Sequence, residues 1–84
     1  MAEIKNIVVL YGGSSSEREV SLKSGKGINQ SLLEMGLQSS LKDFSDIKNL
    51  QSLAEYDLVF IALHGFEGES GRLQKELDYL NIRY

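Results

Sequence analysis

Two short apolar runs, each ending at a glycine turn, constrain the fold of this chain more than any other feature. The first is Ile7–Leu10, inside an expected strand over 4–11, and the second is Leu58–Leu63. Short, β-branched or aromatic runs bounded by turn residues are typical of strands that are covered on both faces. Each run is followed by a helical pattern, and strands that alternate with helices predict an α/β fold with a parallel sheet.

The first helix is expected from Glu17 to Met35, with Gly36 ending it in a left-handed conformation. Gly25 and Gly27 lower helix propensity, and close packing of the helix on a strand explains both. One face of the helix is expected to pack on the sheet, and its apolar or small positions are Val20, Ser24, Ile28, Ser31, Leu32 and Met35.

Weaker patterns predict the remaining elements. Alternation over 37–44 predicts a second, shorter strand, and 45–56 is expected to be a connector with a distorted helical turn. Leucines at helical spacing over 73–80 predict another helix, and 81–84 is expected to lead into a further strand.

The turn after the first strand, Gly12-Gly13-Ser14-Ser15-Ser16, has two interpretations. It is either a backbone nest that holds an anion at a helix N-terminus or a plain tight turn. Ser16 with Glu19 is the preferred capping box, and Ser14 with Glu17 is the alternative. The preferred cap leaves Glu17 as a free carboxylate at the start of the helix.

The carboxyl ends of parallel strands lie at one edge of a sheet, and ligands bind there. The segments Gly12–Glu17 and His64–Glu69 both follow predicted strands. We therefore expect them to converge, with Glu17 near His64.

Composition excludes several function classes. The chain has 84 residues, a length that fits one domain, and it has no cysteine and one histidine. A disulfide framework, a thiolate metal site and a multi-histidine metal site are therefore excluded. The net charge of -3, without a basic stripe, argues against nucleic acid as a partner. The apolar runs are too short to span a membrane and no export signal is evident, so the expected location is the cytoplasm.

The chain contains two spaced signatures. The first runs from Gly12 to Gly25, and the second comprises His64-Gly65, Gly68-Glu69-Ser70-Gly71 and Leu73-Gln74. Together they resemble the amino-terminal region of D-alanine:D-alanine ligases. The similarity extends from about Ile4 to Tyr84. It implies a Rossmann-like, three-layer preATP-grasp domain with a parallel sheet of three to four strands. Residues 1–84 would then be the N-terminal lobe of such a ligase, truncated at its C-terminal end.

The resemblance also implies a reaction. In the family, ATP phosphorylates the carboxylate of the first D-alanine, and the amine of the second attacks the acyl phosphate to form the dipeptide used in peptidoglycan precursors. ATP and Mg²⁺ would be bound by lobes that this chain lacks, so the chain holds neither a cofactor nor a metal and is expected to be inactive alone. The full-length enzyme would be a homodimer.

Site residues follow from the matching motif positions. The resemblance implies that Glu17 binds the ammonium of the first D-alanine and that His64 contacts the same substrate near its carboxylate or α-carbon. Val20 would line the pocket for the methyl group, although its spacing alone predicts a core residue. Gly13 and Ser16 are the further substrate-binding candidates in the glycine and serine turn. Glu69 has two possible roles, since it could support the start of the following helix or orient the ring of His64.

Two other functions are compatible with the residues alone. One is a free-standing Rossmann-like module that binds a nucleotide or phosphate, although the chain lacks the Gly-x-Gly-x-x-Gly fingerprint. The other is an interaction domain without catalytic activity, which would have a large exposed apolar patch.

Overall fold

A parallel sheet forms the centre of the computed structural model, which describes residues 4–65 and 71–84. Within these residues β1 (Asn6–Tyr11) lies between β2 (Gln38–Asp43) and β3 (Leu58–Ile61). Both neighbours run parallel to β1. The predicted α/β class and parallel sheet are confirmed.

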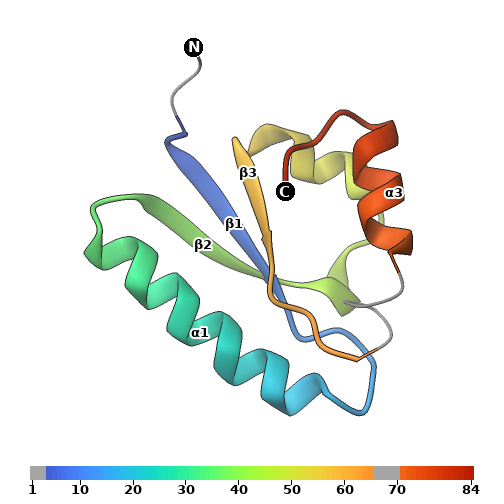
Figure 1. The fold of residues 1–84 in the computed structure, drawn as a ribbon, viewed down its shortest axis with the longest axis horizontal. Helices are drawn as coiled ribbons and strands as arrows, with labels where there is room; N and C mark the ends of the chain where they lie inside the picture. Colours follow the sequence, from blue (N-terminus) through green and yellow to red (C-terminus); the bar gives the residue numbers. More distant parts are fainter. Residues whose placement is uncertain (1–3, 66–70) are drawn as a thin grey trace.

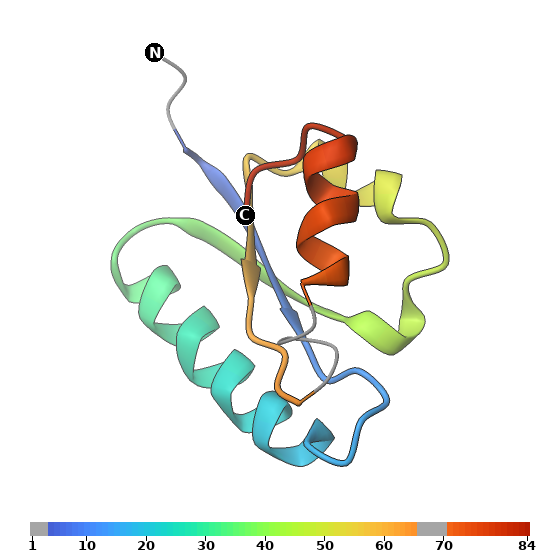
Figure 2. The same cartoon turned by 45° about the vertical axis from the view of Figure 1, so that its right-hand side comes forward.

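Helical elements cover both faces of this sheet (Figure 1). α1 (Arg18–Glu34) packs on β1 and β2 on one face. On the other face lie α3 (Arg72–Tyr79) and two 3₁₀ turns, Phe44–Asp46 and Leu50–Glu55. The turned view in Figure 2 again shows the strands between α1 and α3. The expected three-layer arrangement is therefore confirmed.

The larger core lies between the sheet and α3. Val8 and Leu10 are fully buried in it, and side chains alternate along a strand, so Ile7 and Val9 point to the face that α1 covers. The other buried members come from β3, the second 3₁₀ turn, α3 and the segments that flank them: Leu53, Val59, Leu63, Leu73, Leu77 and Ile82.

The face of α1 that packs on the sheet matches the predicted one only in part, because three of its six predicted members are partly buried: Ser24, Ile28 and Leu32. Val20 is 49% exposed and Met35 is 72% exposed, whereas the buried residues of α1 are Ser21 and Gly25. A Cβ atom at Gly25 would lie 2.5 Å from the Cβ of Tyr11. The helix thus approaches β1 through small residues, which a search for apolar periodicity overlooks.

The two helical glycines have different environments. Gly25 lies against β1, as predicted. A Cβ atom at Gly27 would meet no atom within 4 Å, so the packing explanation is wrong for this position.

α1 ends as predicted at Gly36, which has φ +85°. The Gly36 N–H donates to the carbonyl of Leu33, and the Leu37 N–H donates to the carbonyl of Leu32, at 3.0 and 3.1 Å. This pair of bonds is the Schellman motif, which satisfies carbonyls that a helix end leaves without partners.

The last described residues lie along β3. The Val59 N–H donates to the carbonyl of Arg83 at 2.9 Å, and the Ile82 N–H donates to the carbonyl of Leu77 at the same distance. Residues 82–84 are not part of a strand in the structure, so the lead into a further strand stays a prediction.

Candidate functional site

The carboxyl ends of β1 and β3 are joined by the hydroxyl of Ser21, a residue in the first turn of α1. Ser21 is fully buried. Its Oγ accepts the Gly12 N–H at 2.8 Å and donates to the carbonyl of Ala62 at 2.6 Å. One hydroxyl therefore satisfies the buried backbone groups of two strand ends, and it fixes where the two following loops begin.

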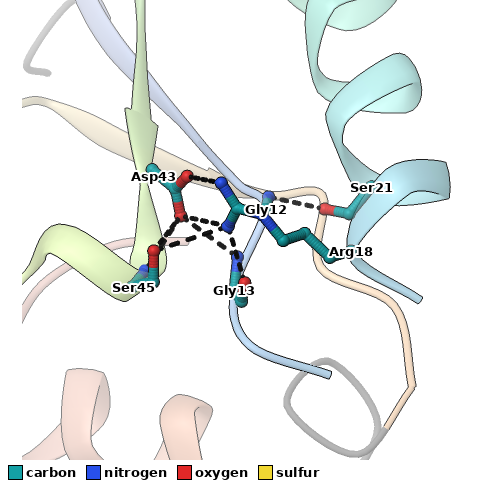
Figure 3. A network of polar contacts seen from close by, with 6 residues as sticks. All are labelled: Gly12, Gly13, Arg18, Ser21, Asp43 and Ser45. Carbon is teal, nitrogen blue, oxygen red and sulfur yellow. Dashed lines mark hydrogen bonds and ion pairs between the residues drawn. The ribbon is translucent and has the colours of Figure 1, made fainter. Parts of the chain in front are cut away.

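A second network holds the glycine turn from the side of β2 (Figure 3). The Arg18 guanidinium pairs with both carboxylate oxygens of Asp43, at 3.1 and 2.6 Å, and donates to the Gly13 carbonyl at 2.7 Å. The Gly13 N–H donates to the Asp43 carboxylate at 3.2 Å. Ser45 donates to the same carboxylate through its backbone N–H and its hydroxyl, at 3.0 and 2.8 Å.

These contacts shift the two ionisable groups in opposite directions. The pKa of Asp43 lies well below its ordinary value, mainly because the carboxylate accepts hydrogen bonds from Arg18, with further bonds from Ser45 and Gly13. The pKa of Arg18 is raised, chiefly by its hydrogen bond with Asp43. Both charged forms are thus favoured in the folded protein, which keeps the pair ionised at neutral pH.

The glycine pair has the conformation expected of a tight turn, because Gly12 and Gly13 both have φ +79°. A Cβ atom at Gly12 would lie 2.6 Å from an Asp43 carboxylate oxygen. The N–H of Gly12 is bonded to Ser21 and that of Gly13 to Asp43. These two donors face partners within the protein, so the observed geometry favours a tight turn over an anion nest.

The predicted cap of α1 is wrong. Glu17, rather than Ser16, occupies the N-cap position, and no side chain caps the helix there. The Glu17 N–H instead donates to Ser15 Oγ in the preceding turn, at 3.2 Å. The start of the helix is held by Arg18 and Ser21, whose partners lie at the end of β2 and just after β1 and β3. A motif of neighbouring residues cannot predict contacts with residues that lie elsewhere in the sequence.

The loops after β1 and β3 converge, as the parallel topology predicts. Ser15 Oγ donates to the carbonyl of His64 at 3.3 Å. Gly65, with φ +72°, packs so closely on the first loop that a Cβ atom there would lie 3.2 Å from Glu17 Cγ. Glu17 therefore lies beside the His64–Gly65 segment. Its carboxylate is exposed and has no hydrogen bond or ion pair with any residue in 4–65 or 71–84.

His64 is also held from α1. Its Nε2 lies 3.1 Å from Ser24 Oγ, and Ser24 Oγ donates to the Val20 carbonyl at 3.0 Å. Val20 is half-exposed, so its core interpretation is wrong, and its predicted contact with substrate stays a prediction. Ser16 is exposed and Gly13 is buried in the turn. Glu69 lies outside the described residues.

Three residues of this edge were not singled out by pattern: Ser21, Ser24 as a partner of His64, and Asp43. The signal that could have found Ser21 is a hydroxyl four residues after Glu17, in the first turn of a helix that follows a glycine turn. Asp43 is the last residue of β2, the strand-end position at which a parallel sheet presents polar side chains.

Within the two described ranges, no helix is long and apolar enough to cross a membrane. The same ranges contain no group of three or more His, Cys, Asp or Glu side chains that could hold a metal ion.

No family model matches the chain, but individual proteins do. The D-alanine:D-alanine ligase of Bordetella petrii is 51% identical over 78 residues, which make up 90% of this chain and 24% of that enzyme. The D-alanine:D-alanine ligase of Halalkalibacterium halodurans is 52% identical over 80 residues, 93% of this chain and 26% of that enzyme. The chain thus spans about a quarter of the length of these curated relatives.

Solved structures agree with the sequence matches. The crystal structure of the D-alanine:D-alanine ligase from Bacillus anthracis complexed with ATP has a TM-score of 0.79 and 30% identity with this chain. The similarity covers 95% of this chain and 28% of that one. In sequence and in fold, the chain corresponds to the amino-terminal part of D-alanine:D-alanine ligases.

Proposed function

We propose that this chain is the part of an ATP-dependent D-alanine:D-alanine ligase that binds the first D-alanine. The observation that carries the proposal is the convergence of Glu17 with the His64–Gly65 segment at the carboxyl edge of the sheet. Similarity to D-alanine:D-alanine ligases supports the reaction, and the edge position supports the binding role, because parallel α/β sheets bind ligands there.

Glu17 is proposed to bind the substrate ammonium. Its carboxylate is exposed and has no partner among the described residues, so an ammonium ion would not have to displace one. A charge-assisted hydrogen bond between the two groups would orient the amino acid at the start of α1.

Val20 is proposed to contact the methyl group of the same substrate. Residues three and four apart lie on one face of a helix, so Val20 shares a face with Glu17 and Ser24. Its half-exposed side chain would then lie between Glu17 and the serine that contacts His64. The ammonium, the methyl group and the carboxylate of D-alanine would then face Glu17, Val20 and His64, respectively.

Gly13 and Ser16 are proposed to act through the turn. Both backbone polar groups of Gly13 are bonded to Arg18 or Asp43, so its contribution would be the shape of the turn beneath the substrate. Ser16 is exposed next to Glu17 and could contact the amino acid with its hydroxyl.

ATP and Mg²⁺ are proposed to bind to parts of the enzyme outside this chain. When bound, ATP supplies the phosphoryl group that activates the first carboxylate. The Bacillus anthracis ligase has a structure complexed with ATP, and the similarity to the present chain covers 28% of that ligase chain. The isolated chain should then be inactive, because one lobe cannot supply the preorganised charges that such a transition state needs. By family resemblance the whole enzyme would be a cytoplasmic homodimer that serves peptidoglycan synthesis.

A segment exchange tests this proposal. Residues 4–84 would replace the matching segment of the Halalkalibacterium halodurans ligase, with which the chain is 52% identical. We expect the chimera to release phosphate from ATP only when D-alanine is present, and to form the dipeptide.

A second chimera controls for damage at the junctions. It carries the matching segment of the Bordetella petrii ligase in the same enzyme. An active Bordetella chimera beside a folded but inactive chimera of the present chain would contradict the proposed function.

A further inference from the structure

The side chain of His64 has a partner on α1 that lies 40 residues earlier in the chain. Ser24 Oγ is 3.1 Å from Nε2 of the ring. The same helix carries Ser21, which fixes the ends of β1 and β3. α1 therefore holds both the loop that carries His64 and the imidazole itself.

The direction of this hydrogen bond follows from a count of hydrogens. A serine hydroxyl has one hydrogen, and Ser24 Oγ donates to the Val20 carbonyl at 3.0 Å. With that hydrogen engaged, Ser24 can only accept from the ring, so Nε2 carries the proton. The reverse arrangement, in which Ser24 donates to Nε2, gives up the bond to Val20. The first arrangement makes two hydrogen bonds and the second makes one.

We propose that Ser24 is a positioning residue that holds His64 in the Nε2–H tautomer and leaves Nδ1 as the hydrogen-bond acceptor of the ring. Nε2–H is also present in the protonated ring, so Nδ1 is the atom at which His64 gains or loses a proton. The neutral ring can then accept a hydrogen bond from a donor group such as an ammonium, and it can donate to a carboxylate through Nδ1 only when protonated. This last consequence rests on the proposed function, whereas the tautomer does not.

The tautomer can be measured in the 84-residue chain, because its one histidine gives a single set of ring signals. The probe is ¹⁵N NMR of both ring nitrogens at alkaline pH, where a histidine side chain is neutral. A blocked histidine peptide under the same conditions gives the reference ratio. We expect the ratio of the Nε2–H tautomer to the Nδ1–H tautomer to be several-fold higher in the chain than in the peptide. We also expect the ring N–H of His64 to exchange slowly with solvent.

Variants assign the effect to the hydroxyl. Ser24→Ala should return the tautomer ratio to that of the peptide and speed the exchange of the ring N–H. Ser24→Thr keeps the hydroxyl and should retain the wild-type ratio. Ser31→Ala, at an exposed position two turns further along the same helix, controls for a change in helix propensity and should have no effect.

Two results would overturn the proposal. One is a predominant Nδ1–H tautomer in the unsubstituted chain, a result that does not depend on the folding of any variant. A carboxylate such as Glu69 would produce this tautomer if it accepted a hydrogen bond from Nδ1–H. The other is a folded Ser24→Ala variant with the wild-type ratio. Neither measurement uses substrate or ATP, so failure of the ligase proposal would leave this result unchanged.

Discussion

Single small side chains determine how closely the layers approach at the functional edge. Ser21 bridges two strand ends, and Gly25 lets α1 contact Tyr11. Both are residues that an apolar pattern ignores, and each can be tested by one substitution.

Replacement of Ser21 by alanine should destabilise the fold by roughly 2 to 4 kcal/mol, because it leaves the Gly12 N–H and the Ala62 carbonyl buried without a partner. Urea unfolding measures the effect. Ser31→Ala is the control, an exposed serine on the same helix, and should change stability by less than about 0.5 kcal/mol. Equal effects of the two substitutions would rule out the bridging role of Ser21.

Alanine at the two helical glycines should have opposite effects. Gly25→Ala places a methyl group against Tyr11 and should cost about 1 to 3 kcal/mol through overpacking. Gly27→Ala enters open space on the helix surface and should stabilise the protein by up to about 1 kcal/mol. Thermal unfolding of both variants checks the signs. A stabilising Gly25→Ala would show that α1 does not lie as close to β1 as described.

At the scale of elements, the Arg18–Asp43 pair connects α1, the glycine turn and β2 (Figure 3). The folded pKa of Asp43 is below the unfolded one. The ionised Asp43 carboxylate therefore contributes its full stabilisation of the fold above the ordinary aspartate pKa of about 3.9. This contribution is lost as the pH falls through and below that value.

Asp43→Asn should accordingly lower the urea midpoint at pH 7 and reduce the fall in stability between about pH 5 and pH 3. Some acid dependence should remain, because the pKa of Asp57 is also lowered, chiefly by hydrogen bonds from the backbone N–H of Lys5 and Asn6. Glu55→Gln removes an exposed carboxylate as a control. An unchanged acid profile in Asp43→Asn would contradict this role of the pair.

The elements themselves could be predicted because their signals are local. The apolar runs at Ile7–Leu10 and Leu58–Leu63 and the stop at Gly36 depend on neighbouring residues only. The orientation of α1 could be predicted only in part in this way. Its packing face is selected by contacts with Tyr11, Gly12 and Ala62, which are brought together only by the folded sheet.

The same distinction applies to the candidate site. Convergence of the two loops follows from parallel topology, and Glu17 does lie beside Gly65. The cap at Ser16 was wrong because the start of α1 is held by long-range partners of Arg18 and Ser21. Motif spacing describes chain neighbours, whereas these contacts depend on tertiary structure.

At the scale of the whole molecule, three layers support one edge at which two strand ends, a glycine turn and the start of α1 meet. Each network at this edge ends at Gly12, Gly13 or the loop of His64. The exposed Glu17 carboxylate has no such structural partner among the described residues. A substitution of Glu17 should therefore remove the function of this side chain with the least effect on folding.

The most direct measurement compares Glu17→Gln with Glu19→Gln in the active ligase chimera. Both substitutions remove one exposed carboxylate from the start of α1. Loss of a charge-assisted hydrogen bond costs about 1.5 to 3 kcal/mol, so Glu17→Gln should lower kcat/KM for the first D-alanine roughly ten- to hundred-fold. The KM for ATP should stay near its original value, and Glu19→Gln should leave both parameters unchanged. Equal kinetics of the two variants would show that Glu17 does not bind the substrate.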